Sequence, residues 1–190
     1  MTALWLKDPL AILAEGAERG VIVEDGRIAA LVPAGQTPAV PAFDASAHVV
    51  LPGLINTHHH FYQTLTRATP AALDRTLFGW LRTLYPLWAR LTPAAVESAA
   101  TVAMAELLLS GCTTTTDHHY VFPAGLEDAV DIEVAAARRL GIRVVLTRGS
   151  MNLSERDGGL PPDSVVQDED TILADSARVI ARHHDPAPHA

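Results

Sequence analysis

Short apolar runs separated by turn-forming residues fill the first fifty positions of the chain. Residues 21–23 and 28–32 are two such runs, and Glu24-Asp25-Gly26-Arg27 lies between them. An Asp-Gly pair between apolar runs is the strongest short signal for a β-hairpin. A proline-rich loop follows, and a further short strand ends at residues 49–51, before the turn at Pro52-Gly53. The pattern therefore predicts β-structure throughout this part.

From residue 51 onward, short apolar runs alternate with longer amphipathic stretches. Strands are expected at residues 54–56, 112–116 and 142–147, and helices at about residues 73–90, 93–110, 126–140 and 168–184. The second helix has the clearest ends, because Thr92 is a good N-cap, Pro93 suits the first helical position and Gly111 follows the last turn. Strands alternating with helices of this length predict three βαβ-type units and a parallel sheet.

Three such units are too few to close an eight-stranded β/α barrel, which takes roughly 250 residues. The chain has 190 residues and ends in Asp185-Pro-Ala-Pro-His-Ala190, without a capping element. We therefore expect a truncated barrel.

The composition, with 48% apolar and 19% charged residues, is that of an ordinary globular protein. Its formal net charge of −8 argues against a nucleic-acid partner, which needs clustered Lys and Arg, and favours a small uncharged or cationic ligand. Neither a signal peptide nor a membrane span is recognisable. The single cysteine, Cys112, excludes an internal disulfide and suits a reducing compartment. These features predict a cytoplasmic protein that binds neither nucleic acid nor membrane.

Two histidines at alternate positions follow the first strand of the β/α region. On an extended chain His58 and His60 project to the same side, whereas His59 faces the other way. Barrel enzymes build their sites at the carboxyl ends of their strands. Neutral imidazoles there suit one divalent metal ion, zinc first and iron as an alternative. The competing interpretation is a polar loop whose histidines are neighbours by chance.

The residues around this pair show a family resemblance. Pro52-Gly-Leu-Ile-Asn-Thr-His-His-His60 resembles the first-strand signature of the amidohydrolase superfamily, in the branch of aromatic-ring deaminases and chlorohydrolases. Residues 56–67, 111–120 and 148–154 are similar to the 8-oxoguanine deaminases, a group related to hydroxyatrazine-type ethylaminohydrolases. The likeness covers essentially the whole chain.

This resemblance implies a fold and a ligand set. Residues 1–50 would form the N-terminal part of a β-sandwich, and residues 51–190 strands 1–3, with their helices, of a metal-dependent (β/α)8 amidohydrolase barrel. One divalent ion would be held by His58 and His60. Such a site is completed by a His on strand five, a His on strand six and an Asp on strand eight, with a Glu near the strand-five His. None can be placed before residue 190, so no catalytic residue is expected within this chain.

Five further residues are candidates for substrate contacts. Gln63 follows the histidine pair at the spacing where guanine-deaminase-like enzymes place a purine-binding glutamine; a solvated loop residue is the alternative. Arg148 resembles a substrate-contacting arginine, with a helix-dipole or salt-bridge role as the alternative. His118 and His119 end the second strand and either line the pocket, orient a ligand or serve the structure. Trp80 is a candidate for stacking on a planar ring, or for core packing.

The resemblance implies hydrolytic deamination of an oxo-purine. A divalent ion would activate water for attack on the ring carbon that bears the amine, and 8-oxoguanine would yield urate and ammonia. Guanine, a pterin or an N-alkylamino hydroxy-triazine are alternative substrates, because the fold does not choose between them. An inactive truncated fragment is an alternative of another class. The expected partner is a small heterocycle. Relatives are often homo-oligomers, but no residue here argues for one.

Overall fold

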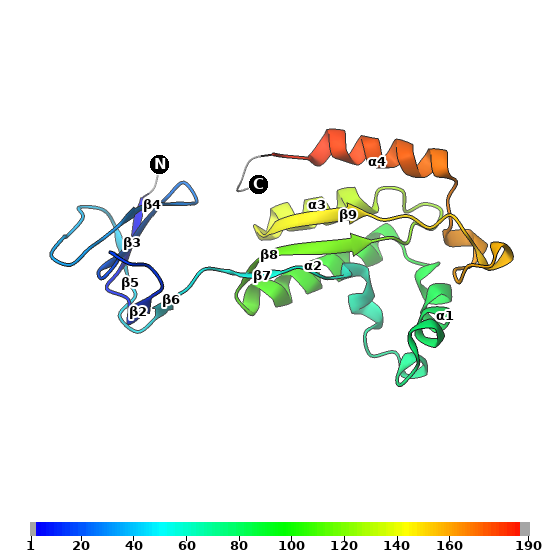
Figure 1. Ribbon diagram of the computed structural model, residues 1–190, viewed down its shortest axis with the longest axis horizontal. Coiled ribbons are helices and arrows are strands. Elements are labelled where there is room, and N and C mark those ends of the chain that lie inside the picture. Colours follow the sequence, from blue (N-terminus) through cyan, green and yellow to red (C-terminus); the bar gives the residue numbers. More distant parts are fainter. Residues whose placement is uncertain (1–2, 187–190) are drawn as a thin grey trace. The chain divides into compact units, whose positions relative to one another are not determined.

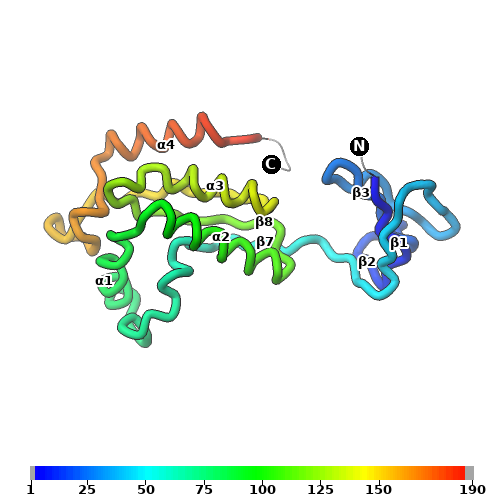
Figure 2. Tube along the Cα trace, turned by 180° about the vertical axis from the view of Figure 1, so that it is seen from behind, coloured from blue at the N-terminus to red at the C-terminus, as the bar shows by residue number. Residues whose placement is uncertain are grey.

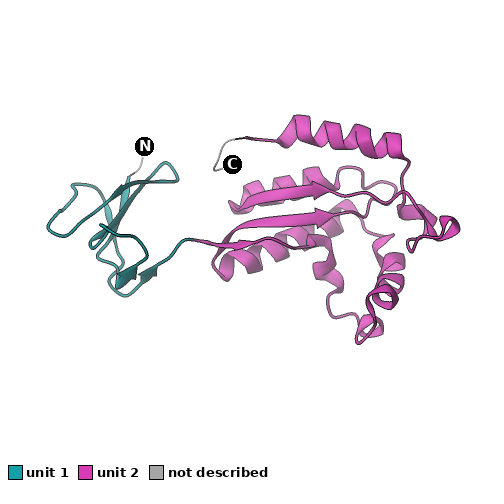
Figure 3. Cartoon of the chain, in the orientation of Figure 1, with its two compact units in different colours: residues 1–52 teal, residues 53–190 magenta. Residues whose placement is uncertain are grey.

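The computed structural model describes residues 3–186. The chain divides into two compact units, residues 1–52 and residues 53–190, which Figure 3 shows in different colours. Each unit has its own secondary structure and its own buried side chains.

The N-terminal unit consists of short strands. Its larger sheet has the order β4-β3-β1-β5, and β2 pairs with β6 in a separate two-stranded sheet. The strands are β1 (Leu4–Lys7), β2 (Ala11–Ile12), β3 (Gly20–Glu24), β4 (Arg27–Leu31), β5 (Ala42–Asp44) and β6 (Val49–Val50). Its core includes Trp5, whose indole N–H donates to the carbonyl of Arg19 at 2.8 Å.

The hairpin predicted in this unit is present. Strands β3 and β4 pair antiparallel, with Glu24 opposite Arg27. The two residues between them, Asp25 and Gly26, have φ angles of 48° and 75°. Two successive positive φ angles match the right-handed twist of the flanking strands, and glycine adopts the second at no steric cost.

The C-terminal unit is built on a parallel sheet of order β7-β8-β9 (Figure 1). Its strands are β7 (Leu54–Asn56), β8 (Cys112–His119) and β9 (Arg143–Arg148). Its helices are α1 (Leu77–Trp88), α2 (Pro93–Leu109), α3 (Ala129–Leu140) and α4 (Glu169–His183). Short 3-10 turns complete it: η1 (Phe61–Thr66), η2 (Pro70–Ala72), η3 (Glu155–Asp157) and η4 (Asp163–Val165). The predicted βαβ arrangement is confirmed.

Helices α2 and α3 lie side by side along the sheet, as the two opposite views show (Figures 1 and 2). A buried apolar cluster joins them to the residues next to the sheet: Phe61, Ala100, Ala103, Met104, Ala136, Ala137 and Ile142. Helix α1 contributes to a second cluster, in which Leu84, Tyr85 and Trp88 pack against Tyr62. These clusters hold η1, the segment that follows the histidine pair, against the helices.

Several element boundaries differ from the sequence-based expectation, among them the start of α3, which is at Ala129 instead of residue 126. Two of the differences have a clear cause. Strand β8 continues to His119, three residues beyond the predicted end, because its pairing with β9 extends to His119 opposite Arg148. Helix α1 begins at Leu77 instead of residue 73, because the side chain of Thr76 caps it by accepting from the N–H of Gly79. In the part of the chain that the structure describes, no helix is long and apolar enough to cross a membrane.

Candidate metal and substrate site

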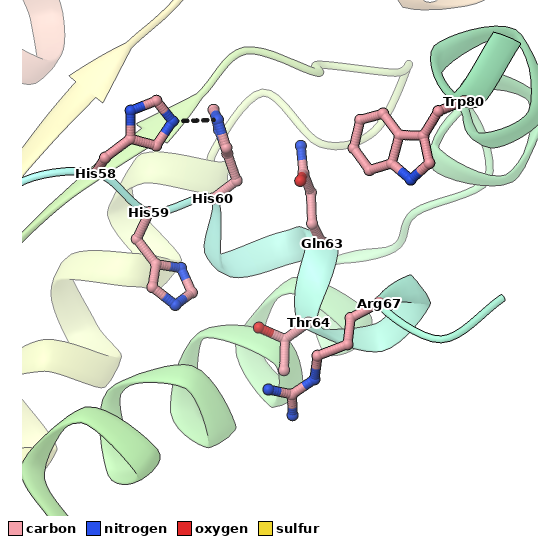
Figure 4. Close-up of a pocket in the computed structure, with 7 residues that line it drawn as sticks. All are labelled: His58, His59, His60, Gln63, Thr64, Arg67 and Trp80. Carbon is pink, nitrogen blue, oxygen red and sulfur yellow. Dashed lines mark hydrogen bonds between the residues drawn. The ribbon is translucent and has the colours of Figure 1, made fainter. Parts of the chain in front are cut away.

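The two predicted metal ligands come together just beyond the end of β7. The Nε2 atoms of His58 and His60 lie 3.2 Å apart (Figure 4). Two nitrogens that each sit about 2.0–2.1 Å from one tetrahedral ion are separated by about 3.3 Å. The backbone N–H of His58 also donates to the side-chain oxygen of Asn56 at 2.9 Å, which fixes the start of this turn. The separation of the two nitrogens therefore fits a single zinc-sized ion.

The protonation of His60 also suits a ligand. Its Nδ1 lies 2.8 Å from the backbone carbonyl oxygen of His118, on β8. Because a carbonyl only accepts, Nδ1 carries the proton and Nε2 presents a lone pair towards His58. Burial lowers the pKa of His60, whereas the hydrogen bond to the His118 carbonyl opposes this shift. The net effect favours the neutral imidazole that metal binding needs.

His59 points away from the pair (Figure 4), as the alternation along the chain predicts. Its backbone carbonyl accepts from the N–H of His118 at 2.9 Å. His118 therefore joins the histidine segment twice, through its N–H to His59 and through its carbonyl to His60. These bonds position the two predicted metal ligands, and they come from the backbone of β8.

A second anchor lies next to the pair. Asp117 Oδ1 accepts from the backbone N–H of Phe61 at 2.5 Å, and both residues are buried. Burial, with a further contribution from the Glu133 carboxylate, raises the pKa of Asp117, although the hydrogen bond from Phe61 opposes the shift. Asp117, His119 and Glu133 each offer one potential ligand atom within 4.8 Å of the others. This fully buried group is therefore a second place whose chemistry is compatible with a cation.

A hollow of about 350 Å³ adjoins the histidine pair, within the size range of small-molecule sites. Its lining residues are His58, His59, His60, Gln63, Thr64, Arg67 and Trp80. Gln63 stands between the pair and the indole of Trp80 (Figure 4), so both candidates for ring contacts lie on this hollow. Sequence reasoning missed Thr64 and Arg67, although η1 and the residue after it place both beside Gln63. The guanidinium of Arg67 forms two hydrogen bonds with the carboxylate of Glu106.

The amide of Gln63 is held from behind by two phenols. Its Nε2 donates to the hydroxyl of Tyr62 at 3.2 Å and to the hydroxyl of Tyr120 at 3.3 Å. Tyr120 also meets the ring of His60 edge to face, with ring centres 5.4 Å apart. Tyr120 therefore contacts both the amide of Gln63 and the ring of His60, a predicted metal ligand.

The other three predicted substrate contacts do not line the hollow; they are His118, His119 and Arg148. The ring of His118 packs 5.0 Å from that of His58, centre to centre. His119 is fully buried, with Nδ1 at 2.8 Å from Glu133 Oε1 and Nε2 at 2.9 Å from the carbonyl of Val121. The substrate roles of these residues stay predictions.

Arg148, the third of these residues, is surrounded by protein partners. Its guanidinium donates to Asp175 at 2.8 Å and to the side chain of Gln167 at 2.5 Å, and it lies 4.1 Å from the ring centre of Phe122. With 3% of its side chain exposed, it links the end of β9 to helix α4. The salt-bridge alternative weighed from the sequence describes these contacts.

Comparison with known proteins identifies the family. Residues 49–187 match the model of the amidohydrolase family, and the chain belongs to that family. It is 61% identical to the 8-oxoguanine deaminase of Pseudomonas aeruginosa over 97% of this chain and 42% of that protein. It is 38% identical to the hydroxydechloroatrazine ethylaminohydrolase of Pseudomonas sp. strain ADP, over 90% of this chain and 38% of that protein. The chain thus spans less than half the length of these relatives.

Solved structures agree with this assignment. The atrazine chlorohydrolase of Arthrobacter aurescens TC1, complexed with zinc, superposes with a TM-score of 0.83 at 27% identity, covering 99% of this chain and 44% of that one. These matches confirm the predicted family and fold class. The zinc bound to that relative supports the presence of a metal site in this chain.

Proposed function

We propose that this chain supplies the metal-holding and ring-binding part of a hydrolase that removes the amino group of an oxo-purine, 8-oxoguanine, to give urate and ammonia. The observation that carries the proposal is the 3.2 Å separation of the Nε2 atoms of His58 and His60, with the Nδ1 proton of His60 engaged by the His118 carbonyl. The 61% identity to an 8-oxoguanine deaminase supports the choice of ring.

The proposed cofactor is one divalent ion, zinc in preference to iron, held by His58 and His60. When bound, such an ion activates water for attack at neutral pH. In this proposal the chain holds the ion and orients the imidazoles that bind it. The β8 backbone keeps the imidazole of His60 in its ligand tautomer, and the buried anchor at Asp117 holds the turn that follows.

The proposed substrate lies flat in the hollow, with Gln63 at its polar edge and Trp80 as an apolar wall. The indole of Trp80 packs edge to face on that of Trp88, with ring centres 5.3 Å apart, so its orientation is constrained. No side chain of the described residues is assigned the proton transfer. From the family resemblance we expect those groups on later strands of the barrel.

The nearest alternatives change the ring or the leaving amine. One relative at 37% identity is an isoxanthopterin deaminase, and another is an ethylaminohydrolase of a hydroxy-triazine. All three rings present a flat polar edge, so the hollow alone does not separate them. The alternative of another class is an inactive fragment without the ligands of strands five, six and eight.

The deciding experiment measures ammonia and alkylamine release by the protein expressed from its complete coding sequence. The panel contains 8-oxoguanine, guanine, isoxanthopterin and hydroxyatrazine. Ammonia and urate from 8-oxoguanine, with activity lost in His58→Ala, support the proposal. Release of ethylamine alone contradicts the purine assignment.

A chimera tests the inactive-fragment alternative. Residues 1–190 replace the matching part of the Pseudomonas aeruginosa 8-oxoguanine deaminase, which supplies the rest of the barrel. An active chimera shows that the site residues of this chain are competent. An inactive but folded, zinc-loaded chimera contradicts the proposal.

We further propose a cytoplasmic location, from the single cysteine, and a small heterocycle as the partner. The oligomeric state stays open between a monomer and a homo-oligomer.

A further inference from the structure

Strand β8 carries a second group of polar side chains, on the face opposite to the histidine pair. Neighbouring residues of a strand point to opposite faces of the sheet. His118 packs on the ring of His58. Asp117 and His119 point the other way, towards Glu133 of α3, and all three side chains are fully buried. One potential ligand atom of each lies within 4.8 Å of the others.

The hydrogen bonds of His119 leave a contact between two acceptors. Its Nε2 lies 2.9 Å from the carbonyl oxygen of Val121, and a carbonyl only accepts, so Nε2 carries a proton. In the neutral imidazole Nδ1 is then a lone pair. It lies 2.8 Å from Oε1 of Glu133, which is also an acceptor when the carboxyl is ionised. A positive charge, either a proton or a metal ion, therefore belongs between these two atoms.

Two further oxygens distinguish a metal ion from a proton. Oδ2 of Asp117 and Oε2 of Glu133 are buried, and neither has a hydrogen-bond partner among the residues that the structure describes. A proton between His119 and Glu133 leaves both oxygens unsatisfied, which raises the free energy of the folded state. One cation bound by all three side chains satisfies both oxygens and Nδ1 together.

The charges of the group favour an ion with two positive charges. Two carboxylates beside a neutral imidazole carry two negative charges in a fully buried space. Burial, with a further contribution from the Glu133 carboxylate, raises the pKa of Asp117, so the surrounding protein does not fully compensate its charge. A divalent cation compensates both carboxylates. One imidazole nitrogen with carboxylate oxygens is a donor set that suits zinc.

We propose that Asp117, His119 and Glu133 form a buried structural site for a divalent ion of the zinc type, in addition to the histidine pair. Its ligand atoms are Nδ1 of His119, Oδ2 of Asp117 and both carboxylate oxygens of Glu133, a set of four that needs no solvent ligand. Oδ1 of Asp117 continues to accept from the N–H of Phe61, the residue after His60. The ion therefore connects α3 to β8 beside the turn that carries the histidine pair.

The test uses the protein from its complete coding sequence, with zinc alone as the probe. The protein is saturated with zinc, loosely bound metal is removed, and the content is measured by inductively coupled plasma mass spectrometry. About two zinc ions per chain are expected. The double variant His58→Ala with His60→Ala is expected to keep about one, held by the buried group, and Glu133→Gln is expected to keep about one, held by the histidine pair.

The matched control is Glu97→Gln on α2, which makes the same chemical change at an exposed carboxylate and is expected to keep about two zinc ions. A thermal melt verifies that each variant is folded. Anomalous diffraction at the zinc edge, from crystals of the unsubstituted protein, does not depend on the folding of any variant. It is expected to show a peak between Asp117, His119 and Glu133.

Two outcomes overturn the inference. The first is a zinc content of about one ion per chain in the unsubstituted protein, with none in the double variant, which leaves only a hydrogen bond between His119 and Glu133. The second is an anomalous map without a peak at this group. A folded Glu133→Gln variant with its zinc content unchanged also contradicts the assigned ligands. None of these measurements involves a substrate, so the inference stands or fails independently of the proposed function.

Discussion

The backbone carbonyl of His118 accepts a hydrogen bond from Nδ1 of His60 over 2.8 Å, and so determines which nitrogen of that ring faces His58. The two residues are 58 positions apart in the chain. The bond exists because β7 and β8 are neighbours in a parallel sheet, which brings their carboxyl ends to one edge. Orientation of a metal ligand by a carbonyl on its second nitrogen is a recurrent feature of metal sites.

The first prediction concerns zinc affinity. His58→Ala and His60→Ala each remove one of two nitrogens 3.2 Å apart, so each is expected to weaken zinc binding by at least ~100-fold. His59→Ala is the matched control, because that ring points away from the pair (Figure 4), and less than a threefold effect is expected. Competition with a chromophoric chelator measures all three. Equal losses in the three variants would contradict the assigned ligands.

The second prediction concerns the buried anchor at Asp117. Asp117→Ala leaves the backbone N–H of Phe61 buried without its acceptor, and is expected to lower the free energy of unfolding by about 1–3 kcal/mol. Asp117→Asn keeps an oxygen at that position and is expected to cost less than half as much. Urea unfolding monitored by fluorescence measures both. An equal or larger loss in the asparagine variant would contradict the role assigned to the oxygen acceptor.

The third prediction concerns the fully buried contact between His119 Nδ1 and Glu133 Oε1, 2.8 Å apart. Glu133→Ala removes the partner of a buried imidazole, and a loss on the order of 3 kcal/mol in the free energy of unfolding is expected. Glu133→Gln retains a hydrogen-bonding group of the same size and is expected to cost less. Chemical denaturation measures whether Glu133→Ala lowers the free energy of unfolding more than Glu133→Gln. Small and equal losses in both variants would contradict the prediction.

The fourth prediction is a pH dependence at the contact between α3 and α4. Burial alone would raise the pKa of Asp131, but the ion pair with Arg178 and the hydrogen bond with His183 outweigh it and the pKa is lowered. The stabilisation that follows is complete above the ordinary aspartate pKa of 3.8, and it is lost as the pH falls through the lower folded-state value.

Unfolding curves collected from pH 7 down to pH 2 test this dependence. The unsubstituted protein is expected to lose stability below about pH 4 faster than Asp131→Asn, because only the carboxylate titrates there. The two proteins are expected to differ most at neutral pH and to converge at the acid end. Parallel curves over the whole range would contradict the assignment.

Local signals explain why much of the fold could be predicted. Asp25-Gly26 encodes a hairpin turn through its own backbone preferences, and Thr92 with Pro93 marks the start of α2 because the cap bond spans only three residues. Boundaries that depend on a partner strand were predicted less well. The end of β8 at His119 depends on pairing with β9, which no local signal encodes.

The sequence by itself determined the βαβ order, the hairpin and the placing of His58 and His60 on one side of the chain, because each depends on neighbours only a few residues away. Tertiary structure decided the rest. The amide of Gln63 meets Tyr120 across 57 positions, and Arg148 meets Asp175 across 27. Hydrogen bonds of this kind depend on direction and on distances to within a few tenths of an ångström. Only the packed sheet and helices set these distances.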